Sequence, residues 1–171
     1  KENFSPNYAG AVSLFVNDTV NISKYKKKIT VFGNTHFQRK FNLKYQNINI
    51  PKIFLGSQSK RYVKEFCKIE NNDKSDLIEI HNRPNYLPYL IDELPDRKFA
   101  IYFHNDPLTM TGSKSIRDRK FLLKNCHKIL FNSNWSKKRF IQGMHNKFLN
   151  SEKLLVVYQS AKKQNIKINK K

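Results

Sequence analysis

A four-residue motif, His-Asn-x-Pro, occurs twice in the chain, at residues 81–84 and 104–107. Each copy follows a short apolar run, residues 76–80 before the first and 99–103 before the second. Runs of this length that are rich in Ile, Phe and Tyr and end before an X-Pro step predict buried strands. The interval between the two runs fits one helix with its loops. The pair therefore predicts a β-α-β unit with parallel strands.

The duplicated motif also predicts the place of a site. Ligands of open α/β sheets bind beyond the carboxyl ends of the strands. His81 and His104 each end one of the predicted strands. We therefore expect the ends of the strands at 76–81 and 98–104 to lie side by side on one edge of a cleft, with both histidines there.

The size and composition are those of one globular domain. The 171 residues include 13 Phe, 8 Tyr and one Trp, which argues against disorder despite a mean hydropathy of −0.70. No run approaches the about 18 to 20 apolar residues of a membrane span, and the first residues lack the apolar core of a signal peptide. Cys67 and Cys126 are too few for a disulfide framework and lack metal-ligand spacing, so we expect buried, reduced thiols in a cytosolic protein.

The net charge of +20 is unevenly distributed along the chain. Residues 21–68 carry 12 Lys and Arg against one acid, and residues 113–171 carry 16 against two. Residues 69–112, which hold both motifs, carry four against eight. Lysine outnumbers arginine 26 to 7, although specific nucleic-acid sites favour arginine. The pattern predicts a locally acidic site between two basic segments, which can face a membrane or a polyphosphate ligand. Drift in the base composition of the gene could also explain much of the excess of lysine.

The rest of the chain continues the alternation of strands and helices. We expect helices at 11–16, 59–69, 84–91, 115–125 and 137–147, and strands at 29–33, 128–131 and 154–158, with candidate edge strands at 48–50 and 53–55. Trp135 is expected in the core. This order predicts an α/β fold, a Rossmann-like parallel sheet with helices on both faces. Residues 1–161 form the predicted domain and 162–171 a basic linker or tail.

Four segments in this order resemble one known fold family. They are Tyr8-Ala9-Gly10-Ala11-Val12, Ile80-His81-Asn82-Arg83-Pro84, Tyr102-Phe103-His104-Asn105 and Phe131-Asn132-Ser133-Asn134. They look like the glycine loop, the two histidine strands and the Val-x-Ser segment of the N-terminal, acceptor-side domain of GT-B glycosyltransferases. The best match is the large retaining family 4, glycosyl transferase group 1, which includes sucrose synthase and the phosphatidylinositol mannosyltransferases. The resemblance covers about residues 4–161.

Three departures limit this resemblance. The family's first strand precedes the glycine loop, and the chain starts too late to contain it fully. The segment that usually ends in Pro-Asn-Gly reads Val157-Tyr158-Gln159-Ser160-Ala161 here. The C-terminal domain, with the Glu pair that holds the nucleotide-sugar in the family, is absent. The resemblance therefore implies half an enzyme.

The resemblance implies transfer of a sugar from a nucleotide-sugar to a surface-glycan acceptor, as in lipopolysaccharide or capsule synthesis, or to a lipid-linked acceptor. His104 would contact the transferred sugar or the reacting hydroxyl as the catalytic residue. The expected substrate-binding residues are Gly10, Ala11, His81, Asn82, Arg83, Asn105, Asp106 and Ser133. No metal and no cofactor other than the nucleotide-sugar substrate are expected. The basic helices at 114–124 and 137–147 would hold this cytoplasmic protein on anionic lipid, peripheral to the inner face of the cytoplasmic membrane.

Each of these residues also has a purely structural interpretation. The histidines can hydrogen-bond a nearby carbonyl at a strand end, and the asparagines can form Asx turns before the prolines. Arg83 can pair with Asp92 or Glu93, Asp106 can cap a turn, and Gly10 can simply turn the chain.

Two other functions remain open at the level of sequence. A basic nucleic-acid-binding α/β domain without catalysis would expose base-stacking aromatics such as Tyr25, Phe37 and Phe41 among its lysines. The acidic segment around the histidines disfavours it, and no nucleic-acid partner is expected. A nucleotide-dependent epimerase or dehydrogenase would carry Gly-x-Gly-x-x-Gly after its first strand, which this sequence lacks.

Overall fold

The computed structural model describes residues 3–51, 56–145, 148 and 151–159, and these fall into two compact units. The first unit contains the residues up to Gln46 together with Gln159, and the second runs from Asn47 to Tyr158. Each unit is described here by itself. The domain boundaries expected from sequence, 1–161 and 162–171, stay a prediction. The expected strand at 53–55 and the tail at 162–171 lie outside the described residues.

The first unit contains one helix and a small sheet. Helix α1 spans Ala11–Ile22, the short 3-10 helix η1 spans Lys26–Lys28, and strands β1 (Val31–Gly33) and β2 (Tyr45–Asn47) form a two-stranded sheet. Phe4 is buried, and its ring centre lies 5.1 Å from those of both Phe41 and Tyr45. The expected helix after Gly10 and the strand near 29–33 are confirmed. The expected edge strand at 48–50 was wrong, because the chain pairs three residues earlier, at β2.

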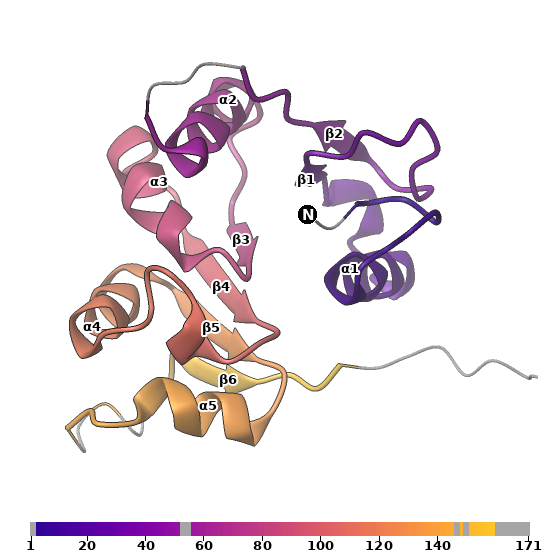
Figure 1. Cartoon of the computed structure of the whole chain (residues 1–171). Coiled ribbons are helices and arrows are strands. Elements are labelled where there is room, and N and C mark those ends of the chain that lie inside the picture. Colours follow the sequence, from indigo (N-terminus) through magenta and orange to yellow (C-terminus); the bar gives the residue numbers. More distant parts are fainter. Residues whose placement is uncertain (1–2, 52–55, 146–147, 149–150, 160–171) are drawn as a thin grey trace, which may run out of the picture. The chain divides into compact units, whose positions relative to one another are not determined.

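The second unit is built on a four-stranded parallel sheet. Its strands are β3 (Ile78–His81), β4 (Phe99–Phe103), β5 (Lys128–Phe131) and β6 (Leu154–Val156), in the order β3-β4-β5-β6. All three neighbouring pairs are parallel. Figure 1 shows these strands side by side and flanked by helices. The predicted α/β class, with a Rossmann-like parallel sheet flanked by helices, is confirmed.

The helices of this unit start at recognisable sequence signals. They are α2 (Gln58–Asp73), η2 (Pro84–Tyr86), α3 (Leu87–Glu93), η3 (Pro107–Thr109), α4 (Ile116–Asn125) and α5 (Asn134–Ile141). Pro84 and Pro107 each begin a 3-10 turn, a position where the missing N–H of proline costs nothing. Ser115 and Asp118 form a capping box at the start of α4. The duplicated motif thus builds the same local structure twice: a strand, a His-Asn corner and a turn opened by proline.

One face of the sheet carries the apolar core. Alternate residues of the strands, including Ile80, Ile101 and Ile129, are buried on this face. The ring centres of Phe103 and Phe131 are 5.7 Å apart on adjacent strands. Phe140 of α5 packs against both rings, with centre distances of 5.7 and 5.3 Å, and is fully buried. This aromatic cluster fixes α5 on the sheet.

The helix expected at 137–147 ends earlier, at Ile141. Gly143 has a φ of +74°, the left-handed conformation in which helices commonly terminate. Met144 is still buried, but beyond the end of the helix. The prediction of a longer helix was therefore wrong because it continued the apolar periodicity through a glycine stop.

The expectation that Trp135 lies in the core was also wrong. Its side chain is 57% exposed. On α5, Ser136 and Phe140 are four residues apart and form the buried face, whereas Trp135 and Arg139 share the adjacent face. The Arg139 guanidinium carbon lies 5.8 Å from the centre of the Trp135 ring. The face of α5 that carries Trp135 therefore does not meet the sheet.

The two cysteines are free and buried, as predicted. Burial raises the pKa of Cys67 to about 11 and that of Cys126 to about 12. Both thiols therefore keep their protons at neutral pH, which makes them unreactive core side chains.

Candidate functional site

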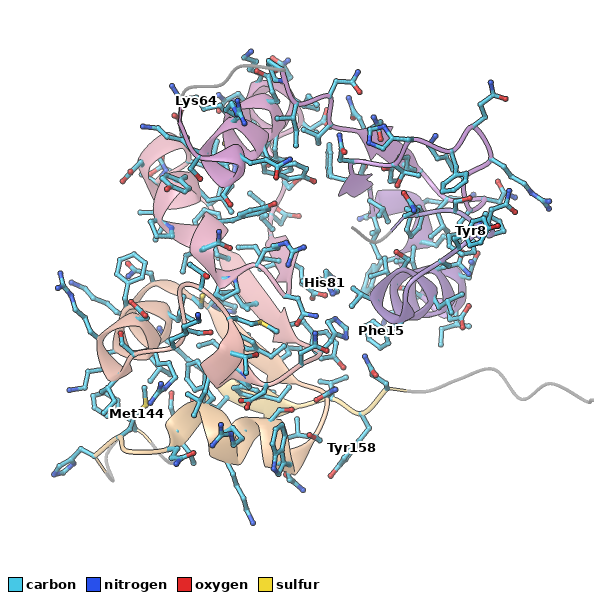
Figure 2. All side chains as sticks on the ribbon, in the orientation of Figure 1. Tyr8, Phe15, Lys64, His81, Met144 and Tyr158 are labelled. Carbon is cyan, nitrogen blue, oxygen red and sulfur yellow. The ribbon has the colours of Figure 1, made fainter. Side chains whose placement is uncertain are left out.

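The strands β3, β4 and β5 all end on one edge of the sheet, where Asn82 directly follows β3, His104 and Asn105 follow β4, and Asn132 follows β5. His81 is paired with Tyr102 in the parallel register, and His104 lies two residues beyond Tyr102. Because side chains alternate along a strand, His81, Tyr102 and His104 point to the same face. Figure 2 shows His81 at the end of β3. The predicted adjacency of the two histidines at one edge is confirmed.

A chain of three hydrogen-bonding side chains links this edge to the middle of β3. The Oε1 atom of Glu79 lies 3.0 Å from Nε2 of His81. The other ring nitrogen of His81, Nδ1, lies 2.8 Å from Nε2 of His104. Glu79 precedes His81 by two residues on the same face of β3. Sequence reasoning did not identify Glu79, although the spacing Glu-x-His within a strand was a usable signal.

The members of this hydrogen-bonded group, Glu79, His81 and His104, differ in their environments, and the pKa values of Glu79 and His104 are shifted. His104 is 8% exposed, and burial followed by the nearby His81 lowers its pKa to about 4. For Glu79, partial burial acts to raise the pKa, but the hydrogen bond from His81 and the attraction to the protonated forms of the two histidines outweigh it and leave the pKa below its usual value. At neutral pH, Glu79 is therefore ionised and His104 is a neutral imidazole.

Tyr102, two residues before His104 on β4, supports the ring of His104. The two ring centres are 4.3 Å apart, with an angle of 25° between the planes. The Tyr102 hydroxyl donates a hydrogen bond to the carbonyl oxygen of Val157, just beyond β6. Burial and the carboxylate of Glu79 raise the pKa of Tyr102 to about 12, so the hydroxyl keeps its proton. The imidazole of His104 is thus stacked on a ring that is itself anchored to the sheet.

Two asparagines hold the main chain of His104 from both neighbouring strand ends. Asn82 has a φ of +51°, which asparagine tolerates, and its Oδ1 accepts a hydrogen bond of 2.8 Å from the His104 N–H. Asn132 donates a 2.7 Å bond from Nδ2 to the His104 carbonyl, while its Oδ1 accepts a 2.7 Å bond from the hydroxyl of Ser136. Asn105, the third strand-end asparagine, is exposed. Sequence reasoning missed Asn132 as a site residue, although it directly follows β5 just as Asn82 directly follows β3.

Asp106 and Ser133, both expected to bind substrate, are occupied by local contacts. The carboxylate of Asp106 caps η3 by accepting a 3.0 Å bond from the Leu108 N–H. It also pairs with Arg139, whose Nη2 and Nε lie 3.0 and 3.2 Å from Oδ2, and this pairing lowers the pKa of Asp106. Ser133 caps α5 by accepting a 3.1 Å bond from the Ser136 N–H. The structure shows the capping roles, and a contact of either residue with substrate stays a prediction.

Arg83 is exposed beside the histidine edge. Its Nη1 donates a 3.2 Å bond to the carbonyl oxygen of Asn82, and its guanidinium lies near the hydroxyl of Tyr86. Within the described part of the chain no acidic side chain forms an ion pair with Arg83, so the pairing with Asp92 or Glu93 is not formed. Its role in binding a phosphate or carboxylate stays a prediction.

Gly10 and Ala11 belong to the first unit and open helix α1. Gly10 is the N-cap, with its carbonyl oxygen accepting a 3.1 Å bond from the Leu14 N–H, and Ala11 is the first helical residue. The φ of Gly10 is −80°, which any residue adopts, whereas the left-handed residue of this loop is Tyr8, at +57°. The turn therefore does not require glycine at position 10. The contact of Gly10 and Ala11 with a ligand stays a prediction.

The groups gathered at this edge suit a hydroxyl- and phosphate-bearing ligand. A neutral imidazole offers one donor and one acceptor, an exposed guanidinium donates to oxyanions, and the amide of Asn105 does both. Among residues 3–51, 56–145, 148 and 151–159, no three His, Cys, Asp or Glu side chains gather as ligands around a metal ion would.

The fold is similar to that of HepE from Anabaena, which was crystallised in complex with UDP and glucose. The two superpose with a TM-score of 0.63 over 94% of this chain and 43% of the HepE chain, at 17% sequence identity. A structural similarity at this low sequence identity shows that the two proteins share a fold. No family model matches the sequence, and a search of curated proteins found no match. The chain thus spans less than half the length of its structural neighbour.

Proposed function

We propose that this chain is the N-terminal, acceptor-side half of a GT-B glycosyltransferase. The observation that carries the proposal is the pair of bonded histidines at the carboxyl edge of a parallel sheet, in a fold shared with a protein that holds UDP and glucose. UDP and glucose together are the parts of a nucleotide-sugar donor. Membership of retaining family 4, suggested by the four sequence segments, belongs to the same proposal.

In this proposal His104 contacts the transferred sugar or the reacting hydroxyl of the acceptor. Tyr102 stacks on the neutral ring and two asparagines hold the main chain of His104, so the position of the ring is set before a ligand arrives. The exposed guanidinium of Arg83 is placed to bind a phosphate oxygen. The nucleotide-sugar is the only small molecule the proposed reaction needs, and its acceptor is a surface glycan or a lipid-linked sugar.

The test uses the full-length protein and labelled nucleotide-sugars, with UDP-glucose first, against glycan and lipid-linked acceptors. We expect label to move from one donor to an acceptor. Residues 1–171 alone should show no transfer, because a C-terminal half would hold most of the donor. Transfer by residues 1–171 alone, or no transfer by the folded full-length protein from any donor, would contradict the proposal.

The nucleic-acid-binding alternative is not favoured. Of its three candidate stacking residues, Phe37 packs on Tyr8 with ring centres 5.8 Å apart, and Phe41 packs edge-on against Phe4. Tyr25 is exposed, with the amine of Lys24 over its ring. Two of the three rings thus pack against the chain's own aromatic side chains. Tight binding of single-stranded nucleic acid at physiological salt, without binding to vesicles, would reverse this judgement.

We further propose that α4 docks the protein on an anionic membrane, on its cytoplasmic face. Phe121 and Ile116 are 39% and 41% exposed. Arg117, Lys120 and Lys124 are exposed on the same helix. Apolar side chains surrounded by cations are typical of helices that lie on anionic lipid. No helix within the described residues has the length and apolar content needed to cross a membrane.

The docking proposal predicts that Arg117→Gln with Lys124→Gln weakens binding to phosphatidylserine vesicles roughly thirtyfold at low salt, since each basic residue near the surface contributes about 1 kcal/mol. Vesicle co-sedimentation measures this, and binding should fade as salt rises. The matched control is Lys60→Gln with Lys64→Gln on α2, because α2 exposes no large apolar side chain (Figure 2 labels Lys64). Equal losses for the two double variants would mean that total charge, and not α4, determines binding. Lys137, in the other segment expected to contact lipid, is unsuitable for such a test because its amine donates a hydrogen bond to the Leu154 carbonyl.

A further inference from the structure

Two large aromatic side chains are exposed at the carboxyl edge of the four-stranded sheet. Trp135 lies in the first turn of α5, which begins three residues after β5 ends, and it is 57% exposed. Tyr158 follows β6 by two residues and is 65% exposed (Figure 2 labels it just beyond β6). Because β5 and β6 are parallel neighbours, both rings lie at the edge where the histidines end β3 and follow β4. Aromatic side chains exposed at such an edge are typical of a ligand-binding surface.

Polar contacts connect the two rings with each other and with the second His-Asn-x-Pro motif. The side-chain amide of Asn134, the residue before Trp135, donates a 3.0 Å bond to the Tyr158 hydroxyl. This bond holds the segment after β6 against the first turn of α5. The Arg139 guanidinium carbon lies 5.8 Å from the centre of the Trp135 ring, and its Nη2 lies 3.0 Å from Oδ2 of Asp106. Asp106 belongs to the motif, so the two rings lie beside the histidine site.

We propose that Trp135 and Tyr158 form an aromatic platform on which a pyranose ring of the acceptor glycan stacks. The axial C–H bonds of a pyranose make one of its faces apolar and slightly positive, and this face is attracted to the negative face of an aromatic ring. The hydroxyls at the rim of the sugar need polar partners. Amide, carboxylate and guanidinium groups adjoin the platform, on Asn134, Asp106 and Arg139. That the sugar belongs to an acceptor rests on the proposed function, whereas the binding of a sugar does not.

Lipid fits this platform less well than a sugar does. An acyl chain laid on the rings would remove water from the Asn134 amide and from the pair of Asp106 with Arg139, and it offers no hydrogen bonds in return. The hydroxyls of a sugar replace those bonds with water by their own. The apolar side chains of α4 are surrounded by cations instead, so the two surfaces should respond to different ligands.

Trp135 is the only tryptophan among the 171 residues, so its fluorescence reports directly on the platform. We expect β-linked tetrasaccharides of glucose, galactose or mannose, added to this chain at millimolar concentration, to change the emission saturably. Tyr158→Ala should weaken the binding by about two- to tenfold, the loss of one ring contact. Tyr25→Ala, which removes a 55% exposed tyrosine of the first unit, is the matched control and should leave the binding unchanged.

The titration of the wild-type chain decides the proposal without reference to how any variant folds. No change of emission with any of the three tetrasaccharides would overturn it. A change with phosphatidylserine vesicles or with uridine monophosphate, and not with the sugars, would also overturn it, because the rings would then bind a membrane or a nucleobase. Emission that changes only with protein concentration would assign the rings to a second copy of the chain and overturn it in the same way.

Kinetics separate the platform from the proposed function. In the full-length enzyme, Trp135→Ala should raise KM for the acceptor about tenfold and leave kcat nearly unchanged, because stacking binds the acceptor equally before and during the reaction. Normal transfer with an unchanged acceptor KM would remove the platform and leave the glycosyltransferase proposal intact. Sugar binding at Trp135 in a protein that transfers no sugar would do the reverse.

Discussion

Replacing His104 with alanine is expected to lower the turnover of the full-length enzyme by a factor on the order of 10² or more. This is the usual loss when a positioned proton carrier or a charge-stabilising hydrogen bond is removed. The effect should be large because Tyr102 holds the ring and two asparagines hold the main chain, so the ring nitrogens are in position before a ligand binds. Steady-state kinetics with the true donor and acceptor measure the loss. His81→Ala should lower turnover less, because His81 acts through His104.

A third histidine, His127, lies beside the same sheet and provides the control. His127 is exposed just before β5, at the opposite end of the sheet, and its main-chain N–H donates a 2.7 Å bond to the carbonyl of Phe99. His127→Ala should leave turnover unchanged. Circular dichroism must show that both variants fold, since a buried strand-end side chain also contributes to stability. A folded His104→Ala enzyme with near-normal turnover would remove His104 from the mechanism.

The sequence predicted those parts of the fold that depend on local pattern. The apolar runs before His81 and His104 predicted two parallel strands. Because both runs are followed by the same His-Asn-x-Pro motif, the histidines were expected to meet at one edge of the sheet. The helix expected at 115–125 agrees with α4, which Ser115 caps at its start. These features follow from residue order along one element, with no knowledge of what packs against it.

Contacts between elements could not be predicted in the same way. The bond from Asn132 to the carbonyl of His104 depends on the register between β4 and β5, which no pattern within either strand specifies. The pairing of Asp106 with Arg139 joins residues on η3 and α5 for the same reason. Trp135 was expected in the core because it is large and aromatic, but its exposure depends on which face of α5 meets the sheet.

The largest loss of stability is expected from Gly112→Ala, in the loop after η3. Gly112 has a φ of +92°, and a Cβ atom there would lie 2.6 Å from the main-chain nitrogen of Asn85 and 2.8 Å from its Cα. Left-handed backbone costs an L-residue about 1–2 kcal/mol. The contact is with backbone, so η2 must move, which adds about 1–3 kcal/mol. We expect the free energy of unfolding to fall by about 2–5 kcal/mol, measured by urea denaturation.

Gly56→Ala separates these two contributions. Gly56 also has a positive φ, +86°, but a Cβ atom there would meet nothing within 4 Å. Its replacement should cost only the backbone strain, about 1–2 kcal/mol. The difference between the variants then measures how tightly the loop after β4 packs on the turn that follows His81. That packing joins the two copies of the His-Asn-x-Pro motif beyond their strands. Equal losses in the two variants would show that η2 yields freely, and that the contact at Gly112 does not hold the histidine edge in place.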